Sequence, residues 1–225
     1  MIPERFHRHW TLMPVEKLME TPINIIGVGS VGSFTCLSLI KMGAKRMQIW
    51  DGDLIDEVNR ANQFVRGKDV GEYKVDALSA VIQDFEDTPI RVHPENFSTA
   101  NTDINGIVIS ALDSMAPRKM VWDTVKNNKD KVDLFIDPRM GAKVFRIYVI
   151  NPKDDKAIKS YEESLYTDDE ATQERCTEKT IIYNVLGIAS WISRAVERHL
   201  SKGISVGYED IVDYETYIHM HTEYA

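Results

Sequence analysis

The sequence predicts an α/β fold: a Rossmann-like, largely parallel sheet with helices on both faces, extended by antiparallel strands. An apolar strand at 23–26 is followed by a glycine-rich turn, a helix at 31–42 and a second strand ending at Asp51, which is the order of a βαβ unit. The run 106–110 is apolar throughout, as in strands buried inside parallel sheets, whereas 143–150 alternates like an antiparallel strand. We expect a single domain over residues 1–225, with an N-terminal helical arm over residues 1–20.

The remaining elements follow from periodicity and flanking residues. Helices are expected at 14–20, from an opening stretch at 69–78 to about 85, from 116 onward and at 181–200. Further strands are expected at 90–93, 132–137, 211–214 and 217–221. The segment 151–179 is rich in Lys, Asp, Glu, Ser and Thr and has few apolar anchors. It is longer than the roughly 12–15 residues that compact domains usually leave without structure, so we expect a mobile or crossover loop there.

The composition limits the function. The chain of 225 residues is 43% apolar and 28% charged, with a net charge of −8 and no cluster of Lys and Arg, which argues against a nucleic-acid or acidic-membrane binder. No apolar run approaches the ~20 residues of a membrane span, and the first residues lack the order of a signal peptide, so we expect a cytoplasmic protein. Cys36 and Cys176 form neither a disulfide framework nor a C-x-x-C zinc motif.

The turn after the first strand predicts a nucleotide site. Gly27, Gly29 and Gly32 have the G-x-G-x-x-G spacing, in which the first glycine allows a tight turn, the second lets a phosphate approach, and the third lets the helix pack closely. The helix N-terminus offers free N–H groups to an anion. Asp51 lies where a carboxylate bonds ribose hydroxyls. The alternative is a tight turn without a ligand.

Two charged residues extend this site. Lys74 lies in the first turn of its helix, where a cation is locally unfavourable, so it indicates a ligand or carboxylate partner; the alternative is a solvated lysine. Asp113 follows the strand at 106–110, and ligands of open α/β sheets bind outside the carboxyl ends of strands. Asp113 is therefore placed to meet nucleotide phosphates or their metal.

Three further side chains have two interpretations each. Cys36 lies among apolar helical residues, which favours a buried, inert thiol over a reactive one. His219 and His221 alternate onto one strand face and could chelate a metal, although solvated strand residues are the favoured interpretation.

With these residues in view, the chain resembles the ThiF/MoeB/HesA family, relatives of the adenylation domain of ubiquitin-activating enzymes. The resemblance rests on 27–32, Asp51-Gly52-Asp53, Asn59, Gln63, 70–74 and Asp113 with Arg118 five positions on. It implies binding of ATP and Mg²⁺ and adenylation of the C-terminal carboxylate of a ubiquitin-like or sulfur-carrier protein ending in glycine.

The resemblance also implies roles for individual residues. Asp51 would hold the ribose, Asn59 and Lys74 would contact the triphosphate, and Asp113 would bind Mg²⁺. Arg8, in a stretch similar to the family's N-terminal arginine motif, would reach the ATP site of a partner subunit, so a homodimer is expected. The full nucleotide-binding set is Gly27, Gly29, Ser30, Gly32, Asp51, Asp53, Asn59, Asn62, Gln63 and Lys74.

Three departures from the family pattern concern the γ-phosphate, the zinc ligands and the transfer of the activated group to a cysteine. Asn62 stands where the family usually has an arginine that grips the γ-phosphate, so either Arg60 or Arg66 substitutes or adenylation is weak. The family's paired C-x-x-C zinc ligands are missing. Cys176 is similar in position to the family's acceptor cysteine, and Arg175 with Lys179 would favour its thiolate.

Two other functions remain open from the sequence. A relative that binds ATP or a partner without turnover would be consistent with the missing arginine at Asn62. An NAD-dependent oxidoreductase would share the glycines and Asp51, but the sequence has no evident hydride-transfer set and that function leaves Lys74 and Asp113 unexplained. Adenylation requires no general base, because the attacking carboxylate is already ionised at neutral pH.

Overall fold

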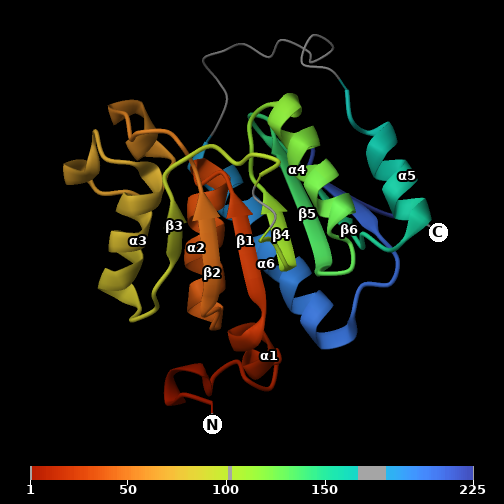
Figure 1. Cartoon of the computed structure of the whole chain (residues 1–225), viewed down its shortest axis with the longest axis horizontal. Coiled ribbons are helices and arrows are strands. Elements are labelled where there is room, and N and C mark those ends of the chain that lie inside the picture. Colours follow the sequence, from red (N-terminus) through yellow and green to blue (C-terminus); the bar gives the residue numbers. More distant parts are fainter. Residues whose placement is uncertain (1, 101–102, 167–180, 225) are drawn as a thin grey trace.

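The computed structural model describes residues 2–100, 103–166 and 181–224, and its centre is one eight-stranded sheet (Figure 1). The strands lie in the order β3-β2-β1-β4-β5-β6-β7-β8; the first five are parallel and the last three antiparallel. This mixed sheet confirms the predicted fold class. The strands are β1 (Pro22–Ile26), β2 (Arg46–Trp50), β3 (Arg91–His93), β4 (Gly106–Ser110), β5 (Val132–Met140), β6 (Val144–Ile150), β7 (Tyr208–Asp213) and β8 (Ile218–Glu223).

The strand order reverses at β1, and open α/β sheets have a crevice outside the carboxyl ends of the strands at such a reversal. From β1 the chain proceeds outward to β2 and β3, then returns to form β4 on the other side of β1. Ligands of open α/β sheets bind where the strand order reverses in this way. The reversal brings the turn after β1 next to the turn after β4, although more than 80 residues separate them in sequence.

Helices cover both faces of the sheet. One face packs against α1 (Val15–Glu20), α2 (Ser30–Met42), α3 (Lys74–Phe85) and α6 (Ile182–Lys202), and the other against α4 (Met115–Asn127) and α5 (Asp155–Glu163). Each face has its own apolar core, because the side chains of a strand alternate between faces. In β1, for example, Ile23 and Ile25 belong to the first core and Ile26 to the second.

The N-terminal arm contains a 3-10 helix, η1 (Glu4–Phe6), followed by α1, as its periodicity predicts. Phe6 is buried, and Arg5 forms an ion pair with Glu86 just after α3 at 2.6 Å. Trp10, the other large aromatic side chain before α1, is 52% exposed. The arm is therefore attached through Phe6, through the fully buried Val15 and Leu18 of α1, and through the ion pair of Arg5.

The expectation of a loop over residues 151–179 is wrong for its first part, because α5 occupies residues 155–163. Asp154 caps this helix by accepting a hydrogen bond from the Lys156 N–H at 3.1 Å. Ala157 and Tyr161, one turn apart, are its buried residues. Two apolar anchors in nine residues produce too weak a period to be recognised in the sequence. Cys176, Arg175 and Lys179 lie outside the described residues.

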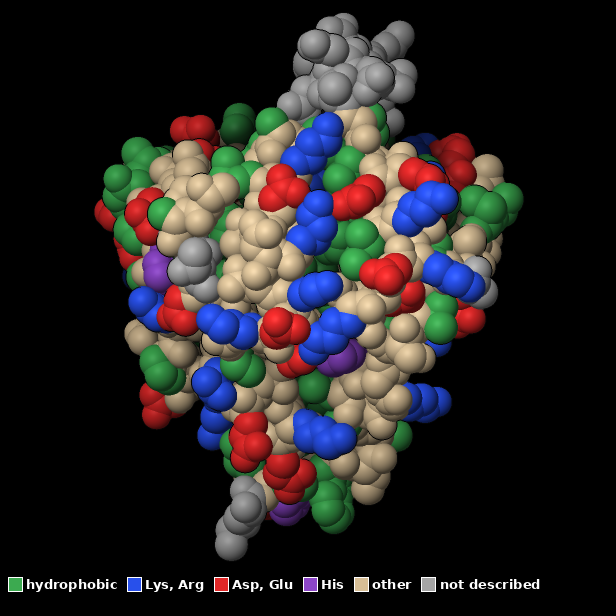
Figure 2. Space-filling view, turned by 45° about the vertical axis from the view of Figure 1, so that its right-hand side comes forward, with side chains coloured by type: hydrophobic (Ala, Val, Ile, Leu, Met, Phe, Trp, Pro, Cys, Tyr) green, Lys and Arg blue, Asp and Glu red, His purple; other side chains and the backbone are tan. Residues whose placement is uncertain are grey.

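Figure 2 shows Lys and Arg side chains interspersed with Asp and Glu over the face that it displays, without a large area of one sign of charge.

Within the described ranges, no helix combines the length and the apolar character needed to cross a bilayer.

Candidate functional site

The glycine-rich turn between β1 and α2 is packed tightly at two glycines and open at the third. Gly27 has a φ of +86°, and a Cβ atom there would overlap the carbonyl group of Ala111 at the end of β4. A Cβ atom at Gly32 would overlap the Gly27 carbonyl oxygen. At Gly29 the nearest atom to an added Cβ is Gln63 Nε2 at 3.8 Å, so this glycine leaves room for a ligand to approach the backbone.

Asp51 fixes this turn to the end of β2. Its Oδ2 atom accepts a hydrogen bond from the Val28 N–H at 2.9 Å, and its Oδ1 atom accepts one from the Asp53 N–H at 2.9 Å. Helix α2 begins at Ser30 without a side-chain cap. The N–H groups of its first turn therefore remain available to an anion at the positive end of the helix dipole.

Lys74 lies beside Asp51 and Asp53. Its position in the first turn of α3 predicted a ligand or a carboxylate partner, and these two carboxylates are such partners. The Lys74 side chain is nearly buried, with Nζ 2.6 Å from Asp53 Oδ2 and 3.7 Å from Asp51 Oδ1. The Asp53 side chain is 69% exposed. Because that carboxylate is solvated, a bound phosphate group can replace it as the partner of the ammonium group without leaving a buried charge unpaired.

The segment after β2 lies over the glycine-rich turn. It contains the 3-10 helix η2 (Glu57–Ala61), which Asn59 caps by accepting the Asp56 N–H at 2.9 Å, and the Phe64 N–H donates to Ser33 Oγ of α2 at 3.1 Å. Gln63 is buried, and its Oε1 atom has no hydrogen-bond partner among the described residues. A buried oxygen of this kind beside an open glycine fits a site that a polar ligand completes.

The two arginines that could compensate for Asn62 are both engaged elsewhere. Arg60 forms an ion pair with Glu57 within η2. Arg66 donates from Nε to Asp69 at 2.9 Å and from Nη1 to Asp84 of α3 at 2.6 Å. A role for either arginine at the γ-phosphate would require these pairs to break.

Asp113 lies across the crevice, after β4. Its side chain is exposed and makes no hydrogen bond or ion pair with the residues that the structure describes. One free carboxylate suits Mg²⁺, which proteins bind through one or two carboxylates together with substrate phosphates and water. Within the described ranges, no group of three or more His, Cys, Asp or Glu side chains is arranged to hold a metal ion by itself.

Arg8 is not near this crevice within its own chain. It is exposed in the turn after η1, and Phe6 of the same arm lies against Gly43, at the end of α2 opposite the glycine-rich turn. The 13 residues of α2 correspond to about 20 Å of helix. Contacts in the structure therefore link Asp51, Asp53 and Lys74 to the glycine-rich turn, where Gln63 lies beside Gly29. Asp113 directly follows Leu112, which packs against Gly27, and Arg8 lies at the other end of the sheet.

The two cysteines and the two C-terminal histidines have separate outcomes. Cys36 is fully buried, and burial raises the pKa of its thiol to about 12, consistent with the predicted inert residue. His219 and His221 are not simply solvated, because His219 Nε2 and His221 Nδ1 lie 2.9 and 2.8 Å from Oδ1 of the buried Asp210. This contact gives the two rings a structural role in the β7–β8 hairpin.

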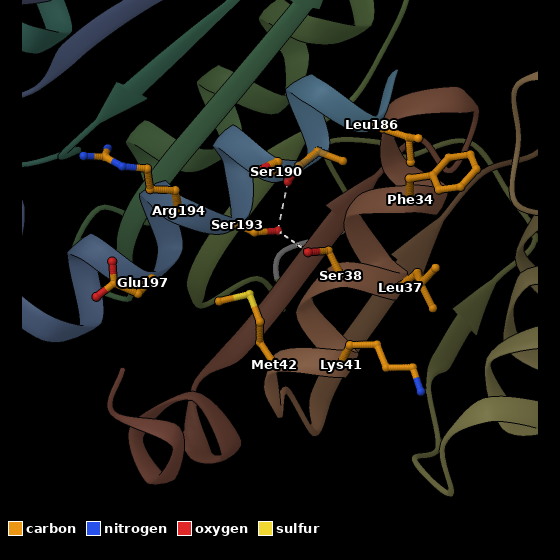
Figure 3. Close-up of a pocket in the computed structure, with 11 residues that line it drawn as sticks. Phe34, Leu37, Ser38, Lys41, Met42, Leu186, Ser190, Ser193, Arg194 and Glu197 are labelled. Atoms are coloured by element: carbon orange, nitrogen blue, oxygen red, sulfur yellow. Dashed lines mark hydrogen bonds between the residues drawn. The ribbon is translucent and has the colours of Figure 1, made fainter. Parts of the chain in front are cut away.

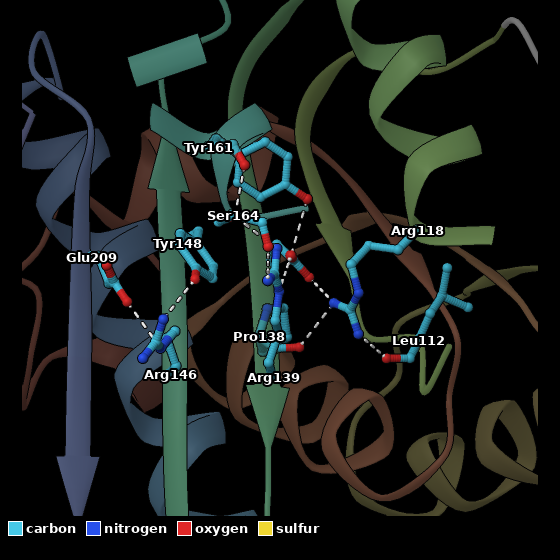
Figure 4. A network of polar contacts seen from close by, with 10 residues as sticks. Leu112, Arg118, Pro138, Arg139, Arg146, Tyr148, Tyr161, Ser164 and Glu209 are labelled. Atoms are coloured by element: carbon cyan, nitrogen blue, oxygen red, sulfur yellow. Dashed lines mark hydrogen bonds and ion pairs between the residues drawn. The ribbon is translucent and has the colours of Figure 1, made fainter. Parts of the chain in front are cut away.

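A polar cluster at β5 was missing from the predicted site. Asp137 is fully buried and accepts hydrogen bonds from Arg118 of α4, from Arg139 and from Tyr161 of α5 (Figure 4). Burial, and then the Asp137 carboxylate, raise the pKa of Tyr161 well above its ordinary value. The available signal was an Asp-Pro-Arg sequence directly after the apolar run 134–136 of β5.

The larger of the cavities described lies away from the glycine-rich turn, in a groove of about 560 Å³ between α2 and α6 (Figure 3). Phe34, Leu37 and Lys41 line it from α2, and Leu186, Arg194 and Glu197 line it from α6. None of the predicted site residues lines it.

Comparison with known proteins places this geometry in context. The model of the ThiF family matches residues 6–202. Ubiquitin-like modifier-activating enzyme 5 of Bombyx mori is 30% identical over 87 residues, covering 38% of this chain and 22% of the relative. Adenylyltransferase and sulfurtransferase uba4 of Aspergillus clavatus is 29% identical over 115 residues, covering 48% of this chain and 23% of the relative.

Solved structures share the fold at low sequence identity. Escherichia coli MccB with ATP superposes with a TM-score of 0.77 at 13% identity, over 100% of this chain and 72% of MccB. The microcin C7 biosynthetic enzyme MccB with N-formylated MccA gives 0.79 at 13% identity, over 100% and 75% of the two chains. The chain spans about a quarter of the length of the curated relatives that it matches.

Proposed function

This chain belongs to the ThiF family, and from that membership we propose that it is an ATP-dependent adenylyltransferase that activates the C-terminal carboxylate of a ubiquitin-like or sulfur-carrier protein. The observation that carries the proposal is the strand reversal, which places the turn holding the open Gly29 and the Asp51–Lys74–Asp53 group next to the turn that carries the exposed Asp113. The relatives named as activating enzyme and adenylyltransferase support the reaction class, and MccB, solved with ATP, supports the nucleotide.

The proposed nucleotide site divides its work among these residues. The α2 N-terminus and the Gly29 backbone would face the phosphates. Gln63 Oε1, which has no partner among the described residues, would accept from a hydroxyl or amino group of the nucleotide. Asp51 would accept from the ribose hydroxyls while it keeps the Val28 N–H. Asn59 and Asn62 lie on the segment that borders this side of the turn.

The proposed reaction joins two anions. A carboxylate oxygen of the substrate forms a bond to the α-phosphorus of ATP, the bond to the bridging oxygen breaks, and pyrophosphate leaves with that electron pair. Catalysis is therefore positioning plus neutralisation of charge, which is the task of Lys74. Asp113 would hold Mg²⁺, which supplies further positive charge at the phosphates when bound.

The proposal includes a homodimer. Arg8 lies about one helix length from the glycine-rich turn of its own chain, so it can act at a nucleotide only in the site of a partner subunit. Exchange activity reconstituted by mixing an Arg8→Ala chain with a chain inactivated at Asp113 would support this arrangement. Full activity of Arg8→Ala alone would remove Arg8 from the site.

The deciding experiment is ATP–pyrophosphate exchange with Mg²⁺, measured with the chain alone and with small proteins or peptides ending in Gly-Gly. Exchange that requires one of these substrates supports adenylation. Asp113→Ala is expected to abolish it, whereas Asp123→Ala, an exposed carboxylate on α4, is the matched control and should leave it unchanged. If a substrate protein becomes linked to the chain through a bond that thiols cleave, and if Cys176→Ser abolishes this link, the proposal extends to transfer onto Cys176.

A second candidate is a nucleotide-binding or partner-binding member of the family without turnover. It is favoured by Asn62 and by the ion pairs that engage Arg60 and Arg66. Measurable ATP binding with no exchange under any substrate would select this function. In that case Asn62→Arg is the substitution expected to restore exchange.

A further inference from the structure

Arg118 connects the end of β4 to β5 through three acceptors. Its guanidinium donates to the main-chain oxygen of Leu112, to the carboxylate of Asp137 and to the main-chain oxygen of Pro138 at 3.3 Å (Figure 4). The side chain is 95% buried within α4. A planar guanidinium can serve three acceptors in fixed directions, which an ammonium group on a flexible stem cannot reproduce.

The acceptor at Leu112 is one residue before Asp113. On its other side, this stretch of chain is held by the glycine-rich turn, because the Ala111 N–H donates to the Ile26 oxygen at 2.8 Å and Gly27 packs against Ala111. Asp113 itself makes no contact of this kind with the described residues. The position of its carboxylate is therefore set by the main chain that Arg118 holds.

Arg118 is in turn fixed by the buried carboxylate of Asp137. That carboxylate also accepts from Arg139 Nε at 2.9 Å and from the Tyr161 hydroxyl at 3.0 Å, and Arg139 Nη1 donates to the Ser164 oxygen at 2.9 Å. These contacts join α4, β5 and the end of α5 in one cluster. Rotation of the Arg118 guanidinium would break several buried hydrogen bonds at once.

We propose that Arg118 is a positioning residue, which presents Asp113 to the divalent cation of the bound nucleotide by holding the Leu112 carbonyl against β5. This inference rests on the proposed adenylation function and assigns to Arg118 a role in cation affinity, which is distinct from a role in folding. Substitution of a residue that orients a metal ligand without contacting the metal typically lowers metal affinity about 10- to 100-fold.

The test compares Arg118→Lys with Arg146→Lys. Arg146 donates to Tyr148 at 3.0 Å and pairs with Glu209 at 2.9 Å. It is more exposed than Arg118 and no hydrogen bond joins it to Leu112 or Asp137, so it controls for the loss of an arginine that does not hold the Asp113 main chain. Calorimetric titration of ATP binding over a range of Mg²⁺ should show a requirement for at least about tenfold more Mg²⁺ in Arg118→Lys only. ATP binding in EDTA should be equal in both variants. An unchanged Mg²⁺ requirement overturns the inference.

A double-mutant cycle separates positioning from general damage. If Arg118 acts through Asp113, Arg118→Lys should have no further effect on the Mg²⁺ requirement in an Asp113→Asn background. Additive losses would contradict the inference. If Arg118→Lys does not fold, the pair Arg118→Gln with Asp137→Asn serves instead, because it leaves neither charge of this pair buried alone.

Hydrogen exchange distinguishes this inference from the proposed function. The peptide containing residues 111–113 should exchange faster in Arg118→Lys than in wild type or Arg146→Lys, whatever the chain binds. Faster exchange together with no binding of ATP and Mg²⁺ by the wild type would remove the proposed function and, with it, the role toward the cation. Unchanged exchange, with normal binding, would remove the positioning role alone.

Discussion

The two sides of the crevice use the same chemistry in different surroundings. On the loop side, Lys74 pairs with Asp51 and the exposed Asp53; on the β5 side, Arg118 pairs with the fully buried Asp137. A solvated pair exchanges partners at little cost, whereas a buried pair is expensive to break. The loop side is therefore suited to receiving a ligand, and the β5 side to holding the backbone that carries Asp113.

The strongest test of this contrast removes one carboxylate from each side. Asp137→Asn leaves Arg118 and Arg139 buried without their counter-charge, and should lower the free energy of unfolding by about 3–5 kcal/mol. Asp53→Asn removes an ion pair of similar length from a solvated position and should lower it by less than about 1 kcal/mol. Urea denaturation measures both values, and equal losses would contradict the contrast.

Lys74→Met should affect activity far more than folding. When no ligand is bound, the ammonium group of Lys74 neutralises Asp51 and Asp53; when a nucleotide is bound, it would neutralise the phosphates. Pyrophosphate exchange should therefore fall about 100-fold in Lys74→Met, equivalent to about 2.7 kcal/mol. Asp53 is solvated, and the less exposed Asp51 keeps its hydrogen bonds from the Val28 and Asp53 N–H groups, so the unfolding free energy should fall by less than in Asp137→Asn. Lys68→Met, at an exposed position in the 3-10 helix η3 (Gly67–Asp69), is the control and should keep full exchange activity.

Two glycine substitutions separate packing from ligand access on the loop side. Gly32→Ala forces α2 away from the Gly27 carbonyl and should cost about 1–3 kcal/mol of stability. Gly29→Ala meets only Gln63 Nε2 at 3.8 Å, so it should cost less stability while it weakens ATP binding by occupying the approach to the backbone. Thermal denaturation and ATP titration of both variants test this, and the reverse ranking of stability would contradict it.

Sequence reasoning predicts the loop side well because its signals are local. The glycine spacing, the strand end at Asp51 and the place of Lys74 in a first helical turn each follow from backbone requirements within a few residues. The parallel strands and the antiparallel extension likewise follow from apolar and alternating runs.

The β5 side was not predicted because its partners meet only in the folded chain. Arg118 and Asp137 occur in a helix and a strand whose relative rotation no local pattern specifies. The same reason applies to Asp210 with His219 and His221, where alternation placed the histidines on one face but not their buried acceptor. Helix α5 was missed because Ala157 and Tyr161 alone form its buried face.

The smallest expected difference between the two sides is in their response to pH. On the loop side, burial and then the charge of Arg91 lower the pKa of His93, whose ring stacks on Trp50 at 4.3 Å and whose carbonyl oxygen accepts the Asp51 N–H. On the β5 side, Tyr161 has a raised pKa and does not titrate near neutrality.

The sign of this effect follows from the lowered pKa of His93. Above the ordinary histidine pKa of about 6.5, the ring is neutral in both the folded and unfolded chains. As the pH falls below 6.5, the unfolded chain takes up the proton first, so stability declines until the pH passes the lower pKa of the folded state.

NMR titration of the His93 ring should give a midpoint below 6.5. Urea denaturation at pH 7.5 and 5.5 should show a smaller pH-dependent loss in His93→Gln than in wild type, and an unchanged loss in Tyr161→Phe. A midpoint at or above 6.5 would show that burial does not control this ring.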